Sequence, residues 1–137
     1  MAAYYELRSS LFRHCHKLEA AANHNSAHIM MGYNCTGDHV RFLHIALSRY
    51  FSALENASMQ PIGASLNGGR VWDKWTSQAV WFYKDTQNQR GEDLLNASGK
   101  IDSICGIKTT RSLDTWIQAL DQREHEEWRR KYPWLNH

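Results

Sequence analysis

The segment from His39 to about Asn56 constrains the fold most, because it is apolar on nearly all sides when its residues are turned through about 100° each. A helix of this kind is covered by neighbouring elements on several sides. We therefore expect it at the centre of an all-α fold. Its main stripe consists of Val40, Leu43, Leu47, Tyr50, Phe51 and Leu54, and its second apolar surface of Phe42, Ile45, Ala46 and Ala53.

Three other segments repeat apolar residues at helical spacing, at about 3–22, at about 71–87 and after Gly106. The run SMQPIGASLNGG at 58–69 has the glycines, proline and small polar residues of a loop. AVWFY is the one β-like run, and it lies inside a helical period. The sequence therefore predicts an all-α, compact helical bundle of about four main helices plus one or two short ones, forming a single domain over residues 1–137.

The expected core follows from these apolar stripes. A chain of 137 residues is long enough to bury such a core without disulfides or metal. His44 lies at the edge of the central stripe, where a hydrogen bond would remove the cost of its burial. The predicted core comprises Leu11, Leu18, Val40, Leu43, Leu47, Phe51, Trp72, Trp75, Phe82, Ile104, Leu113 and Trp116.

Charge and cysteine usage favour a cytoplasmic protein that does not span a membrane. The net charge of +2 is too small to indicate nucleic acid by itself, and it excludes a highly acidic DNA mimic. The three cysteines are an odd number without CxxC spacing, which is typical of reduced thiols. The N-terminal residues lack the layout of a signal peptide, and no run is long and apolar enough to cross a bilayer.

Motifs for metal or cofactor chemistry are lacking. His24 and His28 would share a helical face, with Cys35 or His39 as further ligands, but no recognised zinc spacing results. The patterns GxSxG, HExxH and the phosphate loop do not occur. We therefore expect no metal and no cofactor, and a small enzyme is the third of three function classes, without assigned catalytic residues.

The run IDSICGIKTTRSLDTWI at 101–117 resembles a helix-turn-helix, with Gly106 at the turn. Such a motif would present side chains that contact phosphates and base edges, which makes a regulator of duplex DNA the second function class. Asp114 opposes this interpretation by repelling phosphate. The alternative is an αα-hairpin that packs onto the core. The candidate DNA contacts are Lys108, Thr109, Thr110, Arg111, Thr115 and Gln118.

Aromatic residues carry the leading hypothesis. They make up 12% of the chain, and six are Trp. Trp81 occupies a polar helix face, and charged residues follow Leu120 in a segment that we expect to protrude into solvent. Because exposed Trp, Tyr and Arg dominate binding hot spots, we predict a non-enzymatic protein-binding module, such as a regulator, adaptor or inhibitor of a larger complex, with a homodimer as a further expectation. The candidate anchors are Trp81, Tyr83, Trp128 and Trp134, rimmed by Arg129, Arg130 and Lys131.

Overall fold

The computed structural model describes residues 4–24, 35–54 and 56–135, and within them the protein is all-α, as predicted. Four of its five α-helices are long enough to be main elements, and an isolated antiparallel bridge joins Thr36 to Val71. The elements are α1 (His16–Asn23), α2 (Asp38–Ala53), α3 (Gln60–Ala64), α4 (Lys74–Gln89), α5 (Ile107–Lys131) and the 3-10 turn η1 (Pro133–Leu135).

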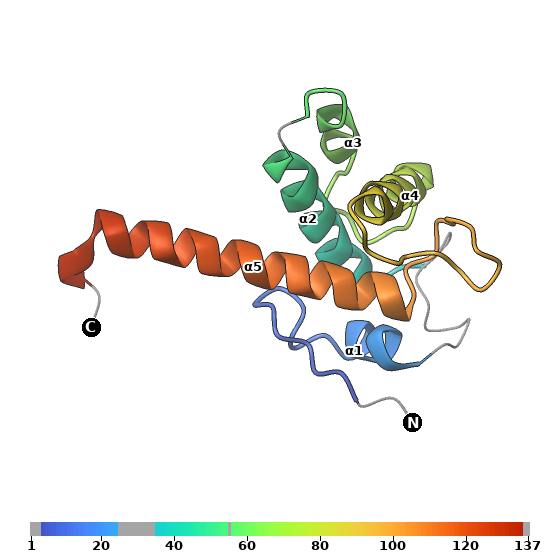
Figure 1. Cartoon of the computed structure of the whole chain (residues 1–137). Helices are drawn as coiled ribbons and strands as arrows, with labels where there is room; N and C mark the ends of the chain where they lie inside the picture. The colour runs from blue at the N-terminus through green and yellow to red at the C-terminus, as the bar shows by residue number, and fades with distance from the viewer. Residues whose placement is uncertain (1–3, 25–34, 55, 136–137) are drawn as a thin grey trace.

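Helix α5 crosses the whole body and then leaves it (Figure 1). In that view α1 and the N-terminal segment lie below α5, and α2, α3 and α4 lie above it. Helix α2 is the central helix, as predicted, and packs against α3, α4 and α5. Gly63 of α3 sits so close to α2 that an added Cβ would lie 2.9 Å from the Cβ of Phe51.

The N-terminal segment departs from prediction. The helix expected over about 3–22 begins only at His16, and residues 4–15 form extended chain and turns. The reason is tertiary: the backbone N–H groups of Arg8 and Ser9 donate to the carboxylate of Asp114 on α5. In a helix these backbone N–H groups would donate to carbonyl groups of the same helix. Here they donate to Asp114 instead, so the segment does not need to be helical.

Seven of the twelve predicted core residues are buried, and three pack partly buried against them, namely Leu11, Phe82 and Trp116. The prediction that Trp75 and Ile104 belong to the core is wrong, because these residues are 43% and 41% exposed. Trp75 lies in the first turn of α4, which Asp73 caps through a reciprocal capping box. That turn stands at the end of the bundle, so Trp72 enters the core instead and its Nε1 donates to Ser77 Oγ at 2.7 Å.

His44 is a hydrogen-bonded core histidine, as predicted. It is 1% exposed, and its Nε2 lies 2.7 Å from Thr76 Oγ1. The Thr76 hydroxyl donates to Asp73 Oδ1, so His44 is the donor in the bond to Thr76. Burial lowers the pKa of His44, and the nearby Asp73 carboxylate opposes this shift only in part.

Candidate functional site

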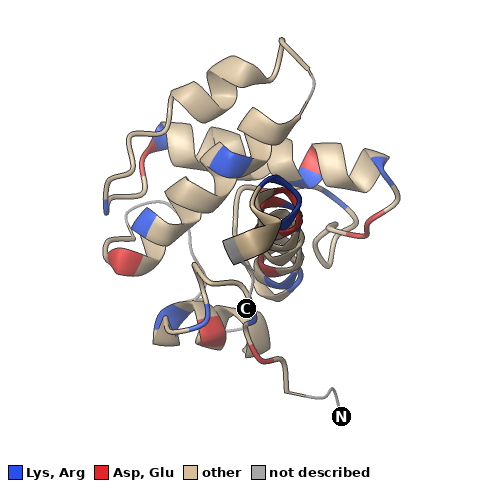
Figure 2. Cartoon of the chain, turned by 90° about the vertical axis from the view of Figure 1, so that its left-hand side faces the viewer, with Lys and Arg blue, Asp and Glu red and all other residues tan. Residues whose placement is uncertain are grey.

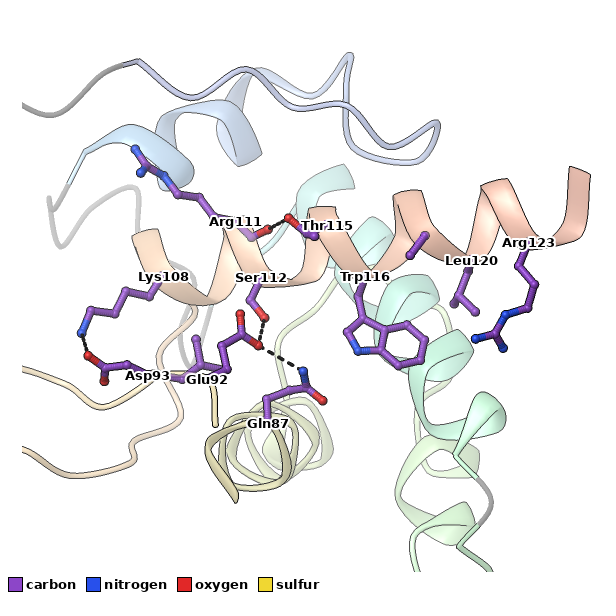
Figure 3. A pocket seen from close by; sticks show the side chains of 12 residues that line it. Gln87, Glu92, Asp93, Lys108, Arg111, Ser112, Thr115, Trp116, Leu120 and Arg123 are labelled. Carbon is purple, nitrogen blue, oxygen red and sulfur yellow. Dashed lines mark hydrogen bonds and ion pairs between the residues drawn. The ribbon is translucent and has the colours of Figure 1, made fainter. Parts of the chain in front are cut away.

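Two surfaces of α5 are candidates for function, and the first is a groove of about 520 Å³ along its body-facing half (Figure 3). The groove runs between α5, the end of α4 and the loop that follows α4. Its lining residues are Gln87, Glu92, Asp93, Leu94, Lys108, Arg111, Ser112, Thr115, Trp116, Ala119, Leu120 and Arg123.

A hydrogen-bond network forms the inner wall of the groove. Ser112 Oγ donates to Glu92 Oε1 at 2.8 Å, so the neighbouring Tyr83 hydroxyl donates to Ser112. From the other side, Gln87 Nε2 donates to the same Glu92 oxygen at 3.0 Å, and the Tyr50 hydroxyl donates to Gln87 at 2.7 Å. Burial raises the pKa of Tyr50 to about 12 and that of Tyr83 well above its ordinary value. Both phenols therefore stay neutral donors, and the network converges on one carboxylate.

This network suits a structural role better than catalysis. The Ser112 hydroxyl donates to Glu92 and accepts from Tyr83, so it is held between two partners. No histidine or cysteine lines the groove among the described residues, so no imidazole stands next to Ser112 to serve as a general base.

The cations around the groove are largely bound within the chain. Lys108 Nζ pairs with Asp93 at 3.2 Å and also donates to the carbonyl of Leu95. Arg111 points toward α1 in Figure 3, where its Nε donates to the Ala22 carbonyl at 2.8 Å. The groove therefore mixes both signs of charge and lacks the one-sided positive field that attracts phosphate.

The predicted helix-turn-helix does not form. Residues 101–105 form no helix, and α5 begins directly after Gly106. Because no preceding helix covers the core at this point, the first turn of α5 packs there itself, and Thr109 and Thr110 are 2% and 0% exposed. Lys108 and Thr115 are exposed and Arg111 and Gln118 partly so, but the six expected DNA contacts do not share an outward face.

Among the predicted partner anchors on α4, the structure separates Trp81 from Tyr83. Trp81 is 37% exposed and meets the ring of Phe82 edge to face. Tyr83 is fully buried, which is a correction: it lies on the core face of α4, and its hydroxyl belongs to the network described above. Tyr83 is therefore not available to a partner.

The second surface is the arm, defined here as residues 122–135. Every residue from Gln122 to Arg130 is exposed, as expected for the charged segment after Leu120. Along the arm the ring of Trp128 stacks with His125 at 6.4 Å and lies 5.9 Å from that of Tyr132, which lies 5.8 Å from Trp134. Trp134 is 65% exposed. The arm thus carries a continuous row of rings.

The sequence prediction named Trp128 and Trp134 but missed His125 and Tyr132. The available signal was their spacing, because positions i, i+3 and i+7 from His125 share one helix face. Figure 2, viewed from the side toward which the arm projects, shows both acidic and basic residues on it. Arg129, Arg130 and Lys131 lie in its last helical turn.

No family model, curated protein or solved structure matches this chain. The groove and the arm are therefore judged on their own geometry and chemistry. For metal binding, the described residues contain no group of three or more His, Cys, Asp or Glu side chains placed to hold an ion. His28 of the histidine set considered above lies outside the described residues. Among the described helices, none combines the length and hydropathy needed to cross a bilayer.

Proposed function

We propose that this protein is a non-enzymatic protein-binding module and that the arm is its contact surface. The observation that carries the proposal is the row of rings on a helix that has left the body, with Trp128 and Trp134 exposed to solvent. Clustered exposed aromatic residues mark interaction sites, and Trp and Tyr dominate the binding energy of most interfaces.

The body of the protein makes the arm a stable platform. A ten-residue helix is marginal by itself in water. Here the helix continues without a break from the buried part of α5, where Leu113, Ile117 and Leu120 anchor it. At the base of the arm, Arg49 of α2 pairs with Asp121 and Glu124, both at 3.1 Å. A pre-ordered arm binds without the entropic cost of folding first.

The other two function classes are less well supported. The Ser112 hydroxyl in the groove is already bonded on both sides, which disfavours a nucleophile there. Thr109 and Thr110 are buried, which removes two of the expected DNA contacts.

The test compares the partners captured by the immobilised full-length protein from lysate of its source organism. The test variant is W128A/W134A on the arm, and the matched control is W81A, which removes a similarly exposed Trp from α4. We expect a protein of defined stoichiometry with the wild type and with W81A, and none with W128A/W134A. Circular dichroism melting would check that each variant is folded. Capture that persists in W128A/W134A would overturn the assignment of the arm, and loss in W81A alone would move the contact surface to α4.

A further inference from the structure

We infer that the partner of the arm is a second copy of this chain, and that the two arms pair antiparallel with Trp128 next to the two-fold axis. The inference rests on the proposed function, because it uses the same surface and names its occupant. It follows from the order of charges along the arm and from their positions around the helix.

The row of rings defines the contact stripe. At about 100° per residue, His125, Trp128 and Tyr132 fall within about 60° of one another around the helix. Their ring contacts agree with this placement. The stripe holds the row of aromatic rings on the arm, so a partner helix would lie along it.

From Glu124 to Lys131 the charged residues are separated by sign, and Trp128 stands at the boundary. Arg123, which comes before them on the arm, lies on the side of the helix away from the stripe. Before Trp128 come Glu124, Glu126 and Glu127, and after it come Arg129, Arg130 and Lys131. A parallel pair of arms would place like charges side by side. An antiparallel pair places the acidic half of each arm against the basic half of the other. A two-fold interface must be complementary to itself, and this order of charges meets that condition.

The positions of the charged residues around the helix support the same antiparallel pairing. Glu124 and Lys131 lie on one flank of the stripe, about 20° apart, while Glu126 and Arg129 lie toward the other flank, about 60° apart. In an antiparallel two-fold pair, each flank meets the same flank of the second copy. With the axis between Glu127 and Trp128, Glu124 faces Lys131 of the second copy, and Glu126 faces Arg129 of the second copy. Symmetry makes each pair occur twice.

The same register brings the rings near one another. Trp128 lies next to its own copy at the axis, and Tyr132 of the second copy lies two residues, about 3 Å along the helix, beyond the position that His125 faces. Glu124 Oε1 already accepts from Arg49, but the Glu124 side chain is 66% exposed. Its second carboxylate oxygen is therefore open to Lys131 of the second copy. The paired part is about 15 Å long at 1.5 Å per residue, so the contact is small and the dimer should dissociate on dilution.

The experiment measures the mass of the full-length protein by sedimentation equilibrium over a dilution series. The wild type should form a dimer, and W128A should be a monomer. E124K and K131E each turn two attractive pairs into repulsive ones, so each should weaken dimerisation by about tenfold or more. The combined variant E124K/K131E restores opposite charges in the antiparallel register and should recover the wild-type dissociation constant to within about threefold.

Each contrary result overturns the inference. A wild type that stays monomeric, a W128A variant that still dimerises, or a double variant that is no better than either single variant would each do so. The proposed function is judged separately. If the wild type is a monomer but captures a different protein, and W128A/W134A loses that protein, then the second copy is refuted and the arm remains the contact surface. If neither self-association nor capture depends on the arm, both proposals fail.

Discussion

The hydroxyl of Tyr5 donates to Asp114 Oδ2 at 2.9 Å, although the two residues are 109 positions apart in the chain. Asp114 is completely buried, and its carboxylate also accepts the backbone N–H groups of Arg8 and Ser9. One side chain of α5 therefore fastens the N-terminal segment to the body. The Arg111 guanidinium, 5.0 Å from the centre of the Tyr5 ring, supports the same contact.

Removing this carboxylate should cost much more stability than removing a neighbouring one. Asp114→Ala leaves the buried N–H of Ser9 and the partly buried N–H of Arg8 and hydroxyl of Tyr5 without their acceptor, so we expect a loss of about 3 kcal/mol or more in the free energy of unfolding. Asp121→Ala is the matched control, because its side chain is 30% exposed and water can replace its contacts with Ser10 and Arg49. Its expected cost is about 1 kcal/mol or less. Urea denaturation measures both, and equal costs would show that Asp114 does not fasten the N-terminal segment.

The ion pair between Lys84 and Asp102 should respond unequally to the loss of either partner. The Lys84 side chain is 5% exposed and donates to Asp102 and to the carbonyl of Ile104, whereas that of Asp102 is 31% exposed. Burial raises the pKa of Asp102, but bonds from Lys84, Asn96 and the Ile104 N–H outweigh it and hold this pKa below its usual value.

Asp102→Ala should therefore cost about 3 kcal/mol or more, since it leaves a buried ammonium without its counter-ion. Lys84→Met should cost less, because water can reach the remaining carboxylate. The double variant Lys84→Met/Asp102→Ala should be more stable than Asp102→Ala alone. Thermal and urea unfolding of the three variants check this order, and the reverse order of the two single variants would contradict it.

Mild acid should destabilise the fold through His44. Burial lowers the pKa of His44 in the folded state, so protons bind the unfolded chain first. The free energy of unfolding should hold steady above the unfolded pKa of about 6.5 and decrease as the pH falls from there toward the lower folded pKa. His39, whose pKa is also lowered by burial and by Lys17, adds a contribution of the same sign.

His44→Gln removes this titration and should flatten the dependence of stability on pH, leaving the part due to His39. Urea denaturation of both proteins at about pH 7.5 and about pH 5.5 measures the difference. A wild type that keeps its full stability at the lower pH would contradict the assignment.

The Cys105 thiol should be unreactive in the folded protein. It is fully buried, burial raises its pKa to about 11, and its Sγ lies 3.5 Å from Thr110 Oγ1. In a variant with Cys15→Ser and Cys35→Ser, a thiol reagent should label Cys105 at the rate of unfolding, so added urea should accelerate labelling. Rapid labelling without denaturant would show that the thiol is accessible.

The sequence predicted those elements whose information is local. The central helix over about 39–56 appears as α2 because an apolar pattern on nearly all sides is satisfied only by cover on several sides. The protruding end of α5 was also foreseen, because its apolar stripe fades after Leu120. The order of acidic and then basic residues from Glu124 to Lys131 is likewise present in the sequence alone.

Tertiary contacts decided the structure of the N-terminal segment and of the segment before α5. The spacing from Tyr4 to Cys15 suits a helix, but the Asp114 carboxylate offers the backbone donors of Arg8 and Ser9 a partner that no local pattern reveals. Similarly, Gly106 could have turned the chain between two helices, yet packing at the start of α5 buries Thr110, and residues 101–105 form no helix.

The hydrogen-bond network of the groove also depends on tertiary contacts and not on local sequence. Tyr50, the neighbouring pair Gln87 and Glu92, and Ser112 come from three separate parts of the chain, and nothing in the sequence links these parts. By itself the sequence determined helical class, a central helix and a solvated arm, because periodicity is set by neighbours three and four residues away. Only the tertiary structure decided which helix ends are covered and which polar groups meet, because burying a donor or acceptor requires a partner from a distant part of the chain.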